Sequence, residues 1–123
     1  MTTRQWLQTG TPEMREYAGS YMHLTEAEGE VWGVIRTAMS SVSDLCVIPM
    51  QDYLNLGAEA RMNFPGTLSD SNWTWRAKDG MMGKSLAQKI RTLTELYARL
   101  GSQGARTAKT AVSSDETGTP ASN

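Results

Sequence analysis

The side chains best suited to bind a ligand lie in an irregular stretch between residues 51 and 76. Arg61 and Asn63 alternate in an apolar loop, so they could present a fork of donors and an amide to ligand hydroxyl groups, such as those of a sugar. Trp73 and Trp75 also alternate and should face opposite ways, so that one indole ring could stack on a sugar. Asn63, Arg61 and Trp73 are therefore the candidate ligand contacts of this stretch. The structural alternatives are an ion pair from Arg61 that holds the loop and a core position for the tryptophans.

Two carboxylates could also approach this stretch. Asp52 directly follows an apolar run, and Glu59 lies in the loop itself. The competing interpretation is structural: Asp52 would cap a short helical turn over residues 52–56, and Glu59 would pair with Arg61 or face solvent. His23 has no second histidine or cysteine pair near it, so its spacing predicts no metal ligand. No glycine pattern for phosphate is present, and we therefore predict neither metal nor cofactor.

Composition restricts the class of protein. Among 123 residues, 12 are basic and 13 acidic, which favours neither nucleic acid nor an anionic membrane as partner. The single cysteine, Cys46, cannot form an internal disulfide and favours a reducing compartment. No apolar stretch approaches about 18 residues, and the first residues lack the apolar region of a signal peptide. We therefore expect a cytoplasmic protein.

Several elements must position the loop. Thr11, followed by Pro12, starts a predicted helix near 12–22. The capping box Thr25–Glu28 starts a second helix whose apolar face extends to Val42. A third is expected over residues 82–100, on the spacing of Leu86, Ile90, Leu93, Tyr97 and Leu100, with Gly101 as its cap.

The apolar run Leu45–Met50 predicts a strand buried on both faces, which Pro49 should end or distort. Helix, strand, loop and helix in this order are typical of an α/β protein. A single strand has no pairing partner, however. The chain is therefore either helical with one extended segment or a piece of a larger sheet. Residues 102–123 are rich in Ser, Thr, Gly and Ala, which predicts a disordered tail after a domain over 1–101.

The motif QDYLNLGAEARMNFPGT, followed by NWTWR, resembles the C-terminal signature of the 4-alpha-glucanotransferases, also called amylomaltases or disproportionating enzymes. The resemblance extends from about Thr2 to about Leu100. Because those enzymes are several times longer, it implies a C-terminal fragment of a (β/α)8 TIM barrel that is mostly helical with one or few strands. Leu45–Met50 would be the eighth strand, and the loop after it would lie at the C-terminal face, where barrel active sites lie.

The resemblance also implies a function. The family's enzymes transfer alpha-1,4-glucan segments between maltooligosaccharides with retention, using two carboxylates and a third, stabilising aspartate. The opening residues, Met1-Thr2-Thr3-Arg4-Gln5-Trp6, resemble the stretch just after that aspartate. We therefore expect no catalytic residue in this chain, an inactive isolated fragment, a maltooligosaccharide or alpha-glucan partner, and possible self-association through the unpaired strand. The alternative is a non-catalytic module that binds a carbohydrate or a partner chain.

Overall fold

The structure is a computed structural model that describes residues 1–101; the predicted tail over 102–123 lies outside the described residues. The described part is helical, with no strand. Its elements are α1 (Thr3–Thr9), α2 (Pro12–Met22), α3 (Glu30–Met39), α4 (Met50–Tyr53), the 3-10 turn η1 (Ala58–Ala60) and α5 (Lys84–Leu96). Within residues 1–101, no helix is long and apolar enough to cross a membrane.

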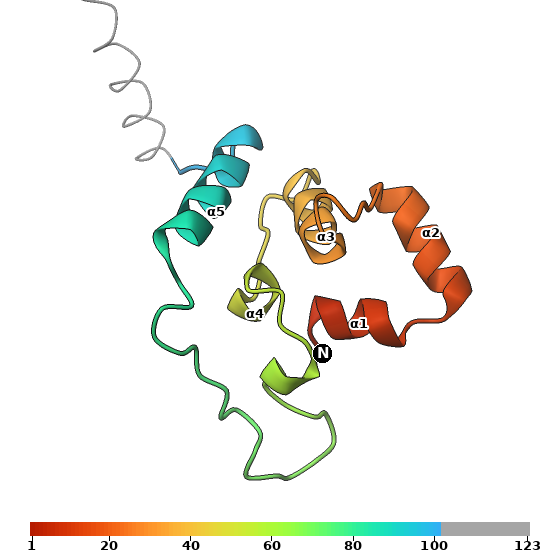
Figure 1. The fold of residues 1–123 in the computed structure, drawn as a ribbon, viewed down its shortest axis with the longest axis vertical. Helices are drawn as coiled ribbons and strands as arrows, with labels where there is room; N and C mark the ends of the chain where they lie inside the picture. Colours follow the sequence, from red (N-terminus) through yellow and green to blue (C-terminus); the bar gives the residue numbers. More distant parts are fainter. Residues whose placement is uncertain (102–123) are drawn as a thin grey trace, which may run out of the picture.

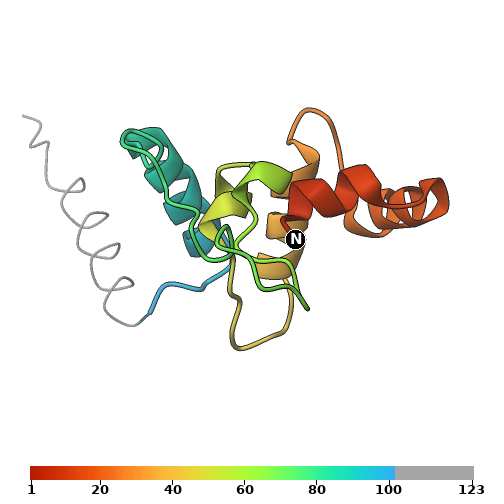
Figure 2. The ribbon, with the colours of Figure 1, turned by 90° about the horizontal axis from the view of Figure 1, so that it is seen from below.

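Helix α3 is the centre of the fold, since α1, α2, α4 and α5 all contact it (Figure 1). Val31, Ile35 and Met39 recur every four residues along α3 and are buried against Leu7 of α1. Figure 2 shows α2 and α5 at opposite ends of the molecule, with α3 and α4 between them. The half-buried side chains that complete this core are Trp6, Leu24, Trp32, Val34, Cys46, Ile48, Tyr53, Leu93 and Tyr97.

The predicted start of α2 is confirmed, whereas that of α3 is wrong. The Thr11 hydroxyl accepts a hydrogen bond from the Met14 amide, and Pro12 opens α2. Thr25 likewise accepts from the amide of Glu28, but this turn ends at Gly29, where φ is 88°. A residue in that conformation cannot continue a right-handed helix, so α3 begins at Glu30. Its apolar face also ends before Val42, which is fully exposed.

Helix α5 is shorter than predicted at both ends. Ala98 adopts φ 53°, and the amides of Ala98 and Arg99 donate to the carbonyls of Glu95 and Thr94. This pair of hydrogen bonds is a Schellman motif, which ends the helix before Gly101 can act as its cap. The five predicted apolar side chains of this region are all half-buried, and α5 contains no fully buried residue.

The predicted strand Leu45–Met50 does not form. Residues 45–48 make no backbone hydrogen bond within residues 1–101, and the Pro49 carbonyl accepts from the amides of Asp52 and Tyr53 as α4 begins at Met50. Cys46 and Ile48 pack on the core, whereas Leu45 and Val47 are 77% and 76% exposed. The side chains thus alternate as in a strand. The physical reason for the difference is that residues 1–101 offer no second strand, so the alternative of a helical chain with one extended segment describes this part.

Two arginines tie the outer helices to α3. Arg36 donates to both carboxylate oxygens of Glu28, at 2.9 and 3.1 Å, and to the Met22 carbonyl at the end of α2, at 2.8 Å. The hydrogen bond to Glu28 raises the pKa of Arg36 above its ordinary value. Arg99 donates to the carbonyls of Met39 and Ser41, at 2.6 and 2.9 Å. Both arginines therefore satisfy carbonyl groups at helix C-termini, where a cation is favoured.

Candidate functional site

A cavity of about 140 Å³ brings together two of the three predicted substrate contacts. It lies where the start of α1, the short helix α4 and the segment after η1 meet. Arg61 and Asn63 both line it, with Asp52 beside them. The complete lining is Met1, Thr2, Pro49, Gln51, Asp52, Ala60, Arg61, Met62 and Asn63.

Asp52 anchors the start of α1. The residue is only 7% exposed. One carboxylate oxygen accepts from the Thr3 amide at 2.8 Å, and the other accepts from the Thr3 hydroxyl at 2.7 Å. The prediction that Asp52 caps a turn over residues 52–56 is therefore wrong. That turn is instead closed by the backbone, with the Leu56 amide donating to the Gln51 carbonyl.

Arg61 holds its own loop, although not through an ion pair. Its Nε donates to the Asn63 carbonyl at 2.7 Å, and its guanidinium lies 4.3 Å from the ring centroid of Phe64. The terminal nitrogens of Arg61 and the side-chain amide of Asn63 make no hydrogen bond within residues 1–101. Both residues line the cavity and are half-buried, so their side chains are placed near a ligand that enters it.

Glu59 does not pair with Arg61. It is exposed to solvent, and one carboxylate oxygen accepts from the Gly57 amide at 2.8 Å. This backbone hydrogen bond lowers the pKa of Glu59 below its ordinary value. The carboxylates of Asp52 and Glu59 thus each accept a hydrogen bond from a backbone amide, of Thr3 and of Gly57 respectively.

Trp73 lies outside the cavity wall. Trp73 is 67% exposed and lies in a turn with φ 65°, whereas Trp75 is half-buried. The two therefore differ in exposure, although Trp73 does not lie in an extended segment. The Trp73 amide donates to the carbonyl of Met62, which does line the cavity. The structure thus joins the Trp73 backbone to the cavity wall but leaves its ring free in solvent.

Sequence reasoning missed two residues that shape this region. Gln51 is 8% exposed, lines the cavity, and donates through Nε2 to the Ala60 carbonyl at 3.4 Å. The Asn72 side chain accepts from the Phe64 amide at 3.0 Å and donates to the Thr67 carbonyl at 3.1 Å. These two hydrogen bonds hold together the loop over residues 64–72. The available signals were the position of Gln51 directly after an apolar run and the tendency of asparagine to bond nearby backbone.

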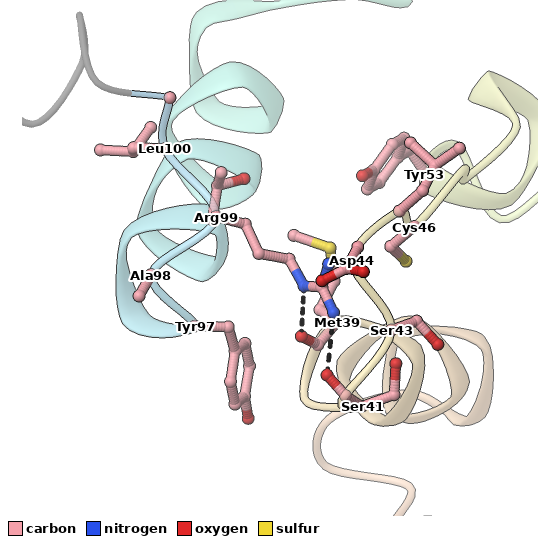
Figure 3. Close-up of a pocket in the computed structure, with 13 residues that line it drawn as sticks. Met39, Ser41, Ser43, Asp44, Cys46, Tyr53, Tyr97, Ala98, Arg99 and Leu100 are labelled. Carbon is pink, nitrogen blue, oxygen red and sulfur yellow. Dashed lines mark hydrogen bonds between the residues drawn. The ribbon is translucent and has the colours of Figure 1, made fainter.

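A larger cleft, of about 630 Å³, opens between the ends of α3 and α5. Figure 3 shows Arg99 reaching across it to the carbonyls of Met39 and Ser41, with Asp44 and Cys46 on the opposite wall. None of the predicted substrate contacts lines this cleft. His23 also lies apart, at the end of α2 with φ 51°. Residues 1–101 contain no group of three His, Cys, Asp or Glu side chains placed to hold a metal ion.

Comparison with known proteins identifies the family. A family model described as 4-alpha-glucanotransferase matches residues 1–82. The chain is 52% identical over 99 residues to a 4-alpha-glucanotransferase of Clostridium butyricum, covering 80% of this chain and 20% of that protein. It is 36% identical over 104 residues to the Thermus thermophilus 4-alpha-glucanotransferase, covering 80% and 21%.

The fold supports the same assignment. A solved amylomaltase from Streptococcus agalactiae, in complex with acarbose, matches with a TM-score of 0.75 and 30% identity, covering 79% of this chain and 19% of that one. The chain thus spans about a fifth of the length of the relatives it matches. With a family model that matches two thirds of its residues and a relative that shares half of its aligned residues, the chain belongs to the 4-alpha-glucanotransferase family.

Proposed function

We propose that residues 1–101 form one wall of the glucan-binding groove of a 4-alpha-glucanotransferase. The observation that carries this proposal is the cavity that Arg61, Asn63 and Asp52 line together. Amide and guanidinium donors suit the hydroxyl groups of a maltooligosaccharide. The acarbose bound to the related amylomaltase supports a sugar-like ligand for this family.

The exposed ring of Trp73 would extend this wall. Its backbone is joined to Met62 at the cavity edge, so a glucan lying on the loop could contact the indole face. Trp73 would then contribute a stacking surface, while Arg61 and Asn63 would orient individual hydroxyl groups. Gln51 would support them by holding the Ala60 carbonyl.

The whole enzyme would transfer alpha-1,4-glucan segments with retention. That chemistry requires a nucleophile and an acid/base carboxylate roughly 5–5.5 Å apart. Asp52 and Glu59, the carboxylates nearest this loop, are bound to Thr3 and Gly57 instead. We therefore assign binding rather than catalysis to these residues and propose that the isolated chain is inactive.

The fold proposed for the whole enzyme is a (β/α)8 barrel. The extended residues 45–49 would be one of its strands, and the cavity would lie in the loop region that follows the strand, at the catalytic face. The relatives reported above are 4-alpha-glucanotransferases or an amylomaltase, so a non-catalytic module is not favoured. With its single cysteine, Cys46, the chain suits a reducing compartment, and the cytoplasm is the proposed location.

A chimeric enzyme tests this function. The stretch of the Clostridium butyricum enzyme that aligns with this chain would be replaced by the chain's own residues, and maltotriose disproportionation would be measured. Asn63→Ala and Arg61→Ala should each raise KM by about 2- to 10-fold with little change in kcat, since each removes a substrate hydrogen bond. Arg15→Ala is the matched control, because Arg15 lies exposed on α2.

Two results would contradict the proposal. The first is an active chimera whose KM and kcat are unaffected by both substitutions in the cavity. The second is release of glucose and longer oligomers from maltotriose by the purified, isolated chain, at a rate proportional to its concentration. The second result would assign catalysis to residues present in this chain.

A further inference from the structure

We propose that Asp52 is a positioning residue for the cavity that binds glucan. By holding Thr3, it fixes the cavity wall at the start of α1 relative to the wall that carries Arg61 and Asn63. This inference rests on the proposed function and deepens it. It assigns to Asp52 an effect on ligand binding that is exerted through other residues.

The first observation is where the buried polar side chains lie. Within residues 1–101, the buried polar or charged residues are Thr2, Gln51 and Asp52, and all of them line this cavity. Burial of a polar group costs free energy unless the group is hydrogen-bonded, and burial of a carboxylate costs more. The polar groups that residues 1–101 bury are thus concentrated in the walls of the candidate site.

The second observation is how two of these residues are bonded. Asp52 accepts from the amide and the hydroxyl of Thr3, the first residue of α1, at 2.8 and 2.7 Å. Its neighbour Gln51 donates to the Ala60 carbonyl at the end of η1, at 3.4 Å. Two consecutive residues of α4 therefore tie this short helix to both of the other cavity walls.

The third observation is that little else joins α1 to α4 at the cavity. Both helices pack on α3, so each is held by a third element. Within residues 1–101, the other side-chain hydrogen bond between the two regions runs from Arg4 to the Asn55 carbonyl, at 3.0 Å. That bond is exposed, and neither residue lines the cavity. Asp52 is therefore the cavity residue that fixes the α1 wall.

A displacement of this wall should weaken binding without any change to the donors themselves. The cavity is only about 140 Å³, so a small movement of one wall alters its shape. At most, the contribution of both Arg61 and Asn63 would be lost. With about 2- to 10-fold in KM expected for each of them, the combined limit is about 4- to 100-fold.

The chimeric Clostridium butyricum enzyme provides the test, with KM and kcat measured on maltotriose and acarbose binding measured by calorimetry. Asp52→Ala should raise KM by about 4- to 100-fold with little change in kcat, and should weaken acarbose binding by a similar factor. Asp52→Asn should stay within about twofold of the parent, because an amide can accept from the Thr3 amide and donate to the Thr3 hydroxyl. Arg4→Met is the matched control, since it removes a bond between the same two regions outside the cavity.

Two further variants extend the test. Thr3→Val is the milder perturbation if Asp52→Ala folds poorly, and loss of its one hydrogen bond should raise KM by about twofold or more. The sharper measurement combines Asp52→Ala with Arg61→Ala and Asn63→Ala. In that background Asp52→Ala should add less than about twofold, because the contacts through which it acts are already absent.

The outcomes separate this inference from the proposed function. An increase in KM from the two donor substitutions, but none from Asp52→Ala or Thr3→Val, would overturn the positioning role alone. That role is also overturned if Asp52→Ala keeps its full effect in the combined background, or if Asp52→Asn or Arg4→Met is impaired as much as Asp52→Ala. If neither Arg61→Ala nor Asn63→Ala changes KM or acarbose binding, the proposed function fails, and the positioning role fails with it.

Discussion

Asp52 and Thr3 join α4 to α1 through two short hydrogen bonds, and their removal should have a measurable cost. Asp52→Ala removes both, leaving the Thr3 amide and hydroxyl without their acceptor. Thr3→Val removes only the bond from the hydroxyl and keeps the branched shape of the side chain.

The expected magnitude follows from the geometry. Each bond to a carboxylate contributes about 1.5–3 kcal/mol, and the two share one acceptor group, so their effects do not add fully. Asp52 is 7% exposed, so water can replace few of the lost hydrogen bonds to Thr3. Asp52→Ala should therefore lower the free energy of unfolding by about 3 kcal/mol and Thr3→Val by about 1.5 kcal/mol.

Urea unfolding followed by tryptophan fluorescence is a suitable assay, because Trp6 lies in α1 and packs on the core. With an m-value of about 1–3 kcal/mol per molar, Asp52→Ala should shift the midpoint by about 1–3 M. Asp44→Ala is the matched control. Asp44 is exposed and makes no ion pair or side-chain hydrogen bond within residues 1–101, so its loss should change stability by less than about 0.5 kcal/mol.

The double variant is the decisive measurement. Once Asp52 is alanine, Thr3→Val has no carboxylate to lose, so the double variant should be about as stable as Asp52→Ala alone. Fully additive effects, or equal stability of Asp52→Ala and Asp44→Ala, would refute the role assigned to this contact.

Three further outcomes are expected. Ala98→Gly should stabilise the chain by about 1 kcal/mol in thermal melts, because Ala98 has a left-handed backbone conformation that favours glycine. Ala87→Gly is the matched control in the interior of α5 and should destabilise the chain by a similar amount. Arg99→Met should lower stability by about 1–2 kcal/mol and speed hydrogen exchange in α5, and unchanged exchange would show that other contacts hold that helix. The isolated chain should sediment as dimers or larger species at micromolar concentration and Val47→Lys as a monomer; a sharp monomer of the parent chain would contradict pairing at the open strand edge.

Features that depend on near neighbours in the chain were readable from the sequence. Thr11 and Pro12 begin α2 because a cap needs only the amides two or three residues on. Val31, Ile35 and Met39 mark the buried face of α3 because helical spacing alone brings them together. The loop motif identified the family. Arg61 and Asn63, two residues apart in that loop, line one cavity, and their contact with substrate stays a prediction.

Features that depend on distant partners were decided only by the tertiary structure. Asp52 has the sequence of a local cap, yet its carboxylate binds Thr3, which is 49 residues away. Leu45–Met50 has the composition of a buried strand, yet backbone pairing requires neighbours that residues 1–101 do not contain. The type of a side chain determines which hydrogen bonds it can make, whereas the fold determines which donors lie within hydrogen-bond distance of it. A buried polar group must be hydrogen-bonded, so it pairs with the donor that the fold places beside it, even when that donor is distant in the sequence.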